Sequence, residues 1–98
     1  MRTGKRLPSR NFVLFIHKGQ NPFPRLGIVV KKEVGLATYR NRIRRYLREF
    51  FRLHKHQFKE PFDMVVLVKK GCSVQQYREA EEELRGLFFK WYLRGRKS

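Results

Sequence analysis

The chain has 98 residues, with 24 lysines and arginines against 8 aspartates and glutamates, so its formal net charge is +16. This length fits one domain spanning residues 1–98, and a hydrophobic fraction of 41% with nine phenylalanines excludes an intrinsically disordered chain. A charge surplus of this size weakens a fold by self-repulsion and attracts polyanions, among which nucleic acid is the commonest.

Three segments have the composition of β-strands. Aliphatic and aromatic residues dominate residues 11–18, 25–32 and 62–70, and turn-forming residues separate these segments. The third segment is a nearly continuous apolar run, which predicts a strand buried on both faces. Alternation along the first strand places Phe12, Leu14 and Ile16 on one face and Val13, Phe15 and His17 on the other.

Two further segments predict helices. Thr38 is the expected N-cap of the first, and Ser73 with Gln76 has the spacing of a capping box that opens the second, from about residue 74 to 93. Glutamates fill the first half of the second helix and cations its second half, which suits the helix dipole. We expect this second helix to cover the sheet with one apolar side, made of Tyr77, Leu84, Leu87, Phe88 and Trp91.

The first helix carries two stripes at the helical period. Its apolar stripe comprises Ile43, Leu47, Phe50, Phe51 and His54. Its polar stripe comprises Asn41, Arg44, Arg45, Arg48, Arg52 and Lys55. Like charges three or four residues apart repel by about 0.2–0.5 kcal/mol per pair, and only Glu49 offsets this cost. A row of guanidinium groups matches a row of phosphates, so the stripe predicts nucleic-acid binding, whereas a merely solvated face would mix both signs.

The sequence also resembles a known family. The run Arg25-Leu26-Gly27-Ile28-Val29-Val30-Lys31-Lys32-Glu33-Val34-Gly35, followed by the Arg40-Asn41-Arg42 signature at the start of the basic helix, is similar to the protein subunit of bacterial ribonuclease P. The segments "NFVLF" and "DMVVLVKK" resemble the strands that flank this region in the family. The match covers about residues 10–70, and the last helix agrees in position rather than in motif.

The resemblance implies a fold and a function. The fold would be an α+β (α/β) sandwich like domain 2 of ribosomal protein S5, in which the basic helix forms a left-handed crossover between parallel strands of a mixed sheet. The function would be that of a ribonucleoprotein whose RNA is the catalyst, holds Mg²⁺ and removes the 5′ leader of precursor tRNA. We therefore expect no catalytic residue, no bound cofactor and no obligatory protein partner in this chain.

The resemblance also implies two contact surfaces. The catalytic RNA would meet Arg40, Asn41, Arg42, Arg44, Arg45, Arg48, Arg52, Lys31 and Lys32. The single-stranded leader would lie on the exposed sheet face, where an aromatic ring can stack on a base, against Phe15, Val13, His17 and Lys69. Family members usually begin with a further segment whose short helix forms one wall of the leader cleft. Because this sequence starts almost at its first predicted strand, we expect that wall to be absent.

Other readings have weaker support. His17, His54, His56 and Cys72 lack a recognised zinc-ligand spacing. A metal-dependent nuclease needs converging carboxylates, but Asp63 is isolated and the glutamates of the last helix face several directions. A structural RNA-binding protein of ribosomal type, with no role in cleavage, remains the alternative. The single cysteine, the lack of a long apolar run and the lack of a signal peptide predict a cytoplasmic protein that does not contact membranes.

Overall fold

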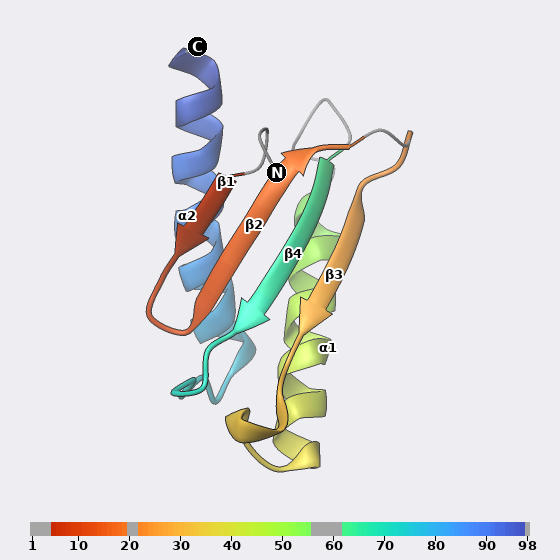
Figure 1. The fold of residues 1–98 in the computed structure, drawn as a ribbon, viewed down its shortest axis with the longest axis vertical. Coiled ribbons are helices and arrows are strands. Elements are labelled where there is room, and N and C mark those ends of the chain that lie inside the picture. Colours follow the sequence, from red (N-terminus) through yellow and green to blue (C-terminus); the bar gives the residue numbers. More distant parts are fainter. Residues whose placement is uncertain (1–4, 20–21, 56–61, 98) are drawn as a thin grey trace.

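The computed structural model of the protein describes residues 5–19, 22–55 and 62–97 (Figure 1). The elements in chain order are β1 (Lys5–Pro8), β2 (Phe12–Lys18), β3 (Arg25–Val29), the short 3-10 turn η1 (Lys32–Val34), α1 (Ala37–His54), β4 (Phe62–Val68) and α2 (Tyr77–Lys97). The strands form one sheet in the order β1-β2-β4-β3. Strand β2 is antiparallel to both β1 and β4, whereas β3 and β4 are parallel, so the predicted mixed sheet is confirmed.

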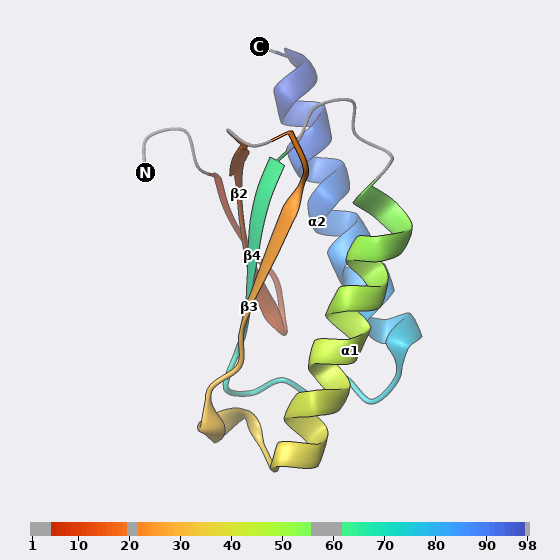
Figure 2. The same ribbon diagram turned by 90° about the vertical axis from the view of Figure 1, so that its right-hand side faces the viewer.

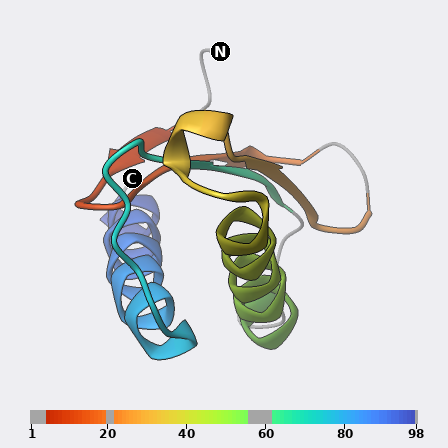
Figure 3. The same ribbon diagram turned by 90° about the horizontal axis from the view of Figure 1, so that it is seen from below.

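Both helices pack on the same face of the sheet. Figure 3 shows α1 and α2 side by side beneath the strands, and Figure 2 shows both helices on one side of the sheet, while no described helix covers the other face. The fold is thus a two-layer α/β sandwich with one open sheet face.

The β3-α1-β4 unit has an uncommon hand. In Figure 1 both parallel strands run downwards, α1 lies behind them, and β4 lies to the left of β3. This arrangement is a left-handed crossover, against the strong preference for right-handed connections. The hand agrees with the one that the family resemblance implied.

The core lies between the sheet and the two helices. Leu14 and Val66 are fully buried on the inner face of the sheet, and Ile43 from α1 and Leu84 from α2 pack against this face with 0% exposure. The rings of Phe50 in α1 and Phe88 in α2 lie 5.3 Å apart, which joins the helices. The predicted apolar stripes are therefore confirmed, except that the side chain of Trp91 lies outside the described part.

The strands differ from the prediction in three ways. Lys5–Pro8 form an unpredicted edge strand, because Leu7 is buried against the core while the ladder to β2 supplies the backbone hydrogen bonds. Strand β3 ends at Val29, so Lys31 and Lys32 lie in the turn that follows it. Strand β4 is buried on one face only. Its apolar outward residues face the open side because both helices pack on the other side, and Val65 is 38% exposed.

The expected N-cap of α1 was wrong. The helix begins at Ala37 with Leu36 as the N-cap, and no side chain caps it. Gly35 has φ 159°, and a Cβ there would lie 3.0 Å from the ring of Tyr39. The backbone turn at Gly35 thus sets the start of the helix before Thr38 is reached.

The expected capping box of α2 was also wrong. The helix runs from Tyr77 to Lys97, and the carboxylate of Glu79 accepts hydrogen bonds from the backbone N–H groups of Gln75 (2.6 Å) and Gln76 (2.9 Å). The backbone N–H of Ser73 instead donates to the side-chain oxygen of buried Asn11 at 3.1 Å. The helix therefore begins four residues after Ser73, and Glu79 rather than Ser73 accepts backbone hydrogen bonds at its start.

Candidate nucleic-acid interface

The polar stripe of α1 faces solvent. Arg45 and Arg48 are exposed and Arg44 is partly exposed, whereas Ile43 and Leu47 on the inner side are at most 1% exposed. The described part of the chain contains no ion pair to these three arginines. The predicted division of the helix into a core face and an arginine face is confirmed.

Two contacts organise this stripe. Asn41 accepts a hydrogen bond from Nη1 of Arg44 at 3.2 Å, so its amide steadies that arginine. Arg52 donates to both carboxylate oxygens of Glu49, at 2.6 and 3.2 Å, and this contact lowers the pKa of Glu49. Arg52 therefore has an internal counter-ion, and most of the unbalanced charge belongs to the other three arginines.

The Arg40-Asn41-Arg42 signature does not act as one unit. Arg40 is partly buried, and its Nε donates to the backbone carbonyl of Gly35 at 3.1 Å. Arg42 is exposed on the other side of the helix, near Tyr39, whose pKa is raised mainly by burial. The first arginine therefore holds the preceding turn against α1, while the third is presented to solvent.

A lysine-rich hollow of about 370 Å³ lies where β3 and β4 end. The carboxyl ends of parallel strands are where open α/β sheets bind ligands. The structure brings together Lys31, which was predicted to contact the catalytic RNA, and Lys69, which was predicted to contact the leader. It adds Lys70, which sequence reasoning missed despite the Lys69-Lys70 pair. The remaining lining residues are Glu33, Val34, Leu67 and Val68. Lys32 is exposed on η1 and is not among the residues that line the hollow.

The open sheet face presents apolar side chains next to this hollow. Phe15 pairs across the strands with Val65, which pairs with Gly27, and the two side chains are 36% and 38% exposed. Gly27 adds no side chain beside Phe15 and Val65, and a Cβ there would lie 3.3 Å from a methyl group of Val65. Phe15 is thus available for stacking. Val13, although predicted as a contact, is only 3% exposed and offers little surface.

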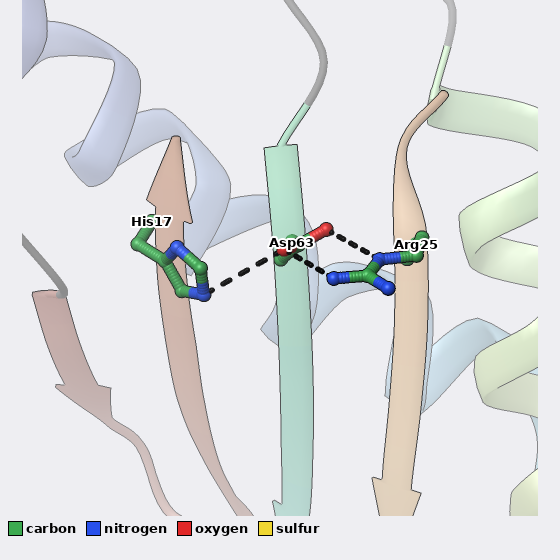
Figure 4. Close-up of polar contacts among 3 residues, drawn as sticks. All are labelled: His17, Arg25 and Asp63. Atoms are coloured by element: carbon green, nitrogen blue, oxygen red, sulfur yellow. Dashed lines mark hydrogen bonds and ion pairs between the residues drawn. The ribbon is translucent and has the colours of Figure 1, made fainter. Parts of the chain in front are cut away.

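A charged row crosses the opposite end of the same face. His17, Asp63 and Arg25 occupy paired positions on β2, β4 and β3, and Figure 4 shows the two outer side chains pointing toward the carboxylate. Nε and Nη2 of Arg25 donate to Asp63 at 3.0 and 2.9 Å, and Nε2 of His17 lies 3.8 Å from the same carboxylate. These contacts lower the pKa of Asp63, with the hydrogen bonds from Arg25 as the main cause.

The pairing of Arg25 with Asp63 should make the stability of the fold depend on pH in acid solution. Because its pKa is lowered in the folded state, the ionised carboxylate of Asp63 stabilises the fold at pH values above the usual pKa of an aspartate. This contribution is lost as the pH falls through the folded-state pKa. The midpoint of thermal unfolding of the wild type should therefore exceed that of the Arg25→Gln/Asp63→Asn variant at neutral pH, and the gap should close below about pH 4. A gap that does not change with pH would show that the pair contributes nothing through its charge.

The carboxylates of α2 are used for structure. In the described ranges no three His, Cys, Asp or Glu side chains are grouped as a metal site. His54 stacks on Phe50, with ring centroids 4.3 Å apart, and its Nε2 lies 3.5 Å from Glu81. The glutamates point in different directions, Glu79 to the backbone ahead of α2, Glu81 also to Arg85, Glu82 to Arg78, and Glu83 to Asn11 and Ser9.

The fold and these surfaces define a small basic α/β domain suited to a polyanionic partner. The family model described as Ribonuclease P matches residues 1–92. The chain belongs to this family, whose members are the protein subunits of ribonuclease P. None of the helices in the described part is both long and apolar enough to span a membrane.

Similar proteins agree with this assignment. The ribonuclease P protein component of Syntrophus aciditrophicus is 41% identical over 87 residues, which are 89% of this chain and 73% of the relative. The component of Desulfatibacillum aliphaticivorans is 44% identical over 73 residues, or 74% of this chain and 62% of the relative. The solved ribonuclease P protein of Thermotoga maritima is 37% identical with a TM-score of 0.75, over 88% of this chain and 82% of that one.

Proposed function

We propose that this subunit binds the catalytic RNA of ribonuclease P through α1 and holds the single-stranded leader of precursor tRNA on the open sheet face, so that the RNA removes the leader. The arginine stripe is the observation that carries this proposal. Arg44, Arg45 and Arg48 repel one another on a helix whose other side is already used by the core. Contacts with phosphate oxygens would offset this repulsion and contribute to the free energy of binding.

The open sheet face and the lysine hollow support the proposed contact with the leader. An unpaired base can stack on the exposed ring of Phe15, and the lysine hollow at the end of the same face can take the phosphate backbone. A structural RNA-binding role alone would require no such apolar face. The chemical step is left to the RNA and its Mg²⁺, and this chain serves to bind and position both RNAs in the cytoplasm.

A cleavage assay tests this proposal. Precursor tRNA is incubated with the protein alone, with the catalytic RNA alone, and with both at low Mg²⁺. We expect cleavage at low Mg²⁺ only with both components, because the cationic surfaces offset the repulsion between the two RNAs. Metal-dependent cleavage by the protein alone, surviving nuclease-free purification, would contradict the assignment of the chemistry to the RNA. Binding of the catalytic RNA without any gain in cleavage would favour the purely structural role.

A further inference from the structure

The charged row of His17, Asp63 and Arg25 lies at the opposite end of the open face from the lysine hollow. Asp63 and Lys69 are separated along β4 and its continuation by six residues, or roughly 20 Å of extended chain. The Phe15–Val65 row lies between them. The open face therefore has an apolar middle, the lysines of the hollow at one end, and Arg25, paired with Asp63, at the other.

Within the charged row, the carboxylate of Asp63 is largely buried, whereas the guanidinium group of Arg25 is exposed to solvent. The side chain of Asp63 is 13% exposed, whereas that of Arg25 is 63% exposed and that of His17 is 29% exposed. The two hydrogen bonds from Arg25 fix its guanidinium group on the sheet. A side chain that is already held in place loses less conformational entropy when it binds a ligand.

We propose that Arg25 and His17 form a second phosphate subsite for the leader, in which Asp63 is the positioning residue. The proposal rests on the proposed function, because it assigns a further part of the leader to the same sheet face. The planar guanidinium group can donate to phosphate oxygens, and the imidazole on the far side of Asp63 can donate to the same backbone.

The position of the row in the fold selects the part of the leader that it contacts. The Arg40-Asn41-Arg42 signature and the lysine hollow lie at one end of the molecule, because Arg40 holds the turn that carries Lys31 and Lys32. As part of this proposal, catalytic RNA bound along α1 would place the cleavage site toward the end that carries the lysine hollow. The charged row therefore contacts leader nucleotides that are farther from the cleavage site.

Leader length is the variable that tests this subsite. The variant Arg25→Gln/Asp63→Asn removes one charge of each sign, so the net charge of the chain is unchanged. Affinities of the holoenzyme are measured for mature tRNA and for precursors whose leaders grow by one nucleotide at a time. We expect the variant to match the wild type for mature tRNA and the shortest leaders, and to lose roughly three- to tenfold in affinity for the longest ones.

A second variant distinguishes loss of the phosphate subsite from loss of folding. His17→Gln leaves the Arg25–Asp63 pair intact and should reduce the affinity for long leaders by a smaller factor. If both variants follow the wild type at every leader length, or lose affinity equally for mature tRNA, the second subsite is wrong.

The proposed function has a separate readout in the same experiment. Phe15→Ala should lower the preference for precursor over mature tRNA, whereas Phe89→Ala, which removes an exposed ring from α2, should not. If Phe15→Ala has no effect either, the sheet face does not hold the leader and the proposed leader contact fails as a whole. If only the row variants have no effect, the leader contact stands without the second subsite.

Discussion

Replacing Arg44, Arg45 and Arg48 together by glutamine should weaken binding of the catalytic RNA by roughly tenfold or more, without lowering the free energy of unfolding. Each lost phosphate contact reduces the slope of log affinity against log salt by about 0.7–0.9, so three contacts should reduce it by about 2–3. The fold should be unaffected or slightly stabilised, because the variant relieves repulsion between exposed like charges. Salt-titrated binding and denaturant unfolding of the same preparations measure both effects.

A variant of equal charge separates a local contact from the field of the whole protein. Glutamine at Arg78, Arg85 and Lys90 removes the same number of charges from exposed positions on α2. We expect this control to change the affinity and the salt slope much less than the α1 variant. Equal losses from the two triple variants would mean that RNA responds only to net charge and that the stripe is not the interface.

Leu47→Ala should have the opposite profile. The side chain is 1% exposed in the centre of the core, so its removal should leave a cavity and cost about 2–5 kcal/mol of the free energy of unfolding. Where the variant is still folded, its salt slope for RNA binding should equal that of the wild type, because no phosphate contact is lost. Leu53→Ala is the matched control on the same helix, since Leu53 is 47% exposed and its loss should change stability by no more than about 0.5 kcal/mol.

These two results together test the orientation of α1. If the arginine variant unfolds while Leu47→Ala weakens RNA binding without loss of stability, the faces of the helix are assigned the wrong way round. We expect the opposite result, because Leu47 is buried whereas Arg45 and Arg48 are exposed.

Much of the site could be predicted because it depends on local periodicity. The two stripes of α1 follow from helical geometry and the order of residues 41 to 54, which no distant contact can change while the segment is helical. The alternation in β2 likewise separated Phe15 from Leu14 before any partner strand was known. The ends of the helices were less predictable, because several polar residues near each end could act as caps. Ahead of α2 the backbone N–H groups donate to Glu79 and not to Ser73, and no side chain caps α1.

The sequence by itself determined the basic helix, its division into a core side and a solvent-exposed arginine side, and the family signature, because all three are encoded in contiguous residues. Only the tertiary structure decided which residues become neighbours across strands. The parallel pairing of β3 with β4 joins Arg25 to Asp63 and brings Lys31 to Lys69, although about 38 residues separate the members of each pair. It also decided that β4 is covered on one face only, because the left-handed crossover places α1 beside α2 and leaves the other face open. Such pairings depend on packing between distant segments, which local periodicity does not specify.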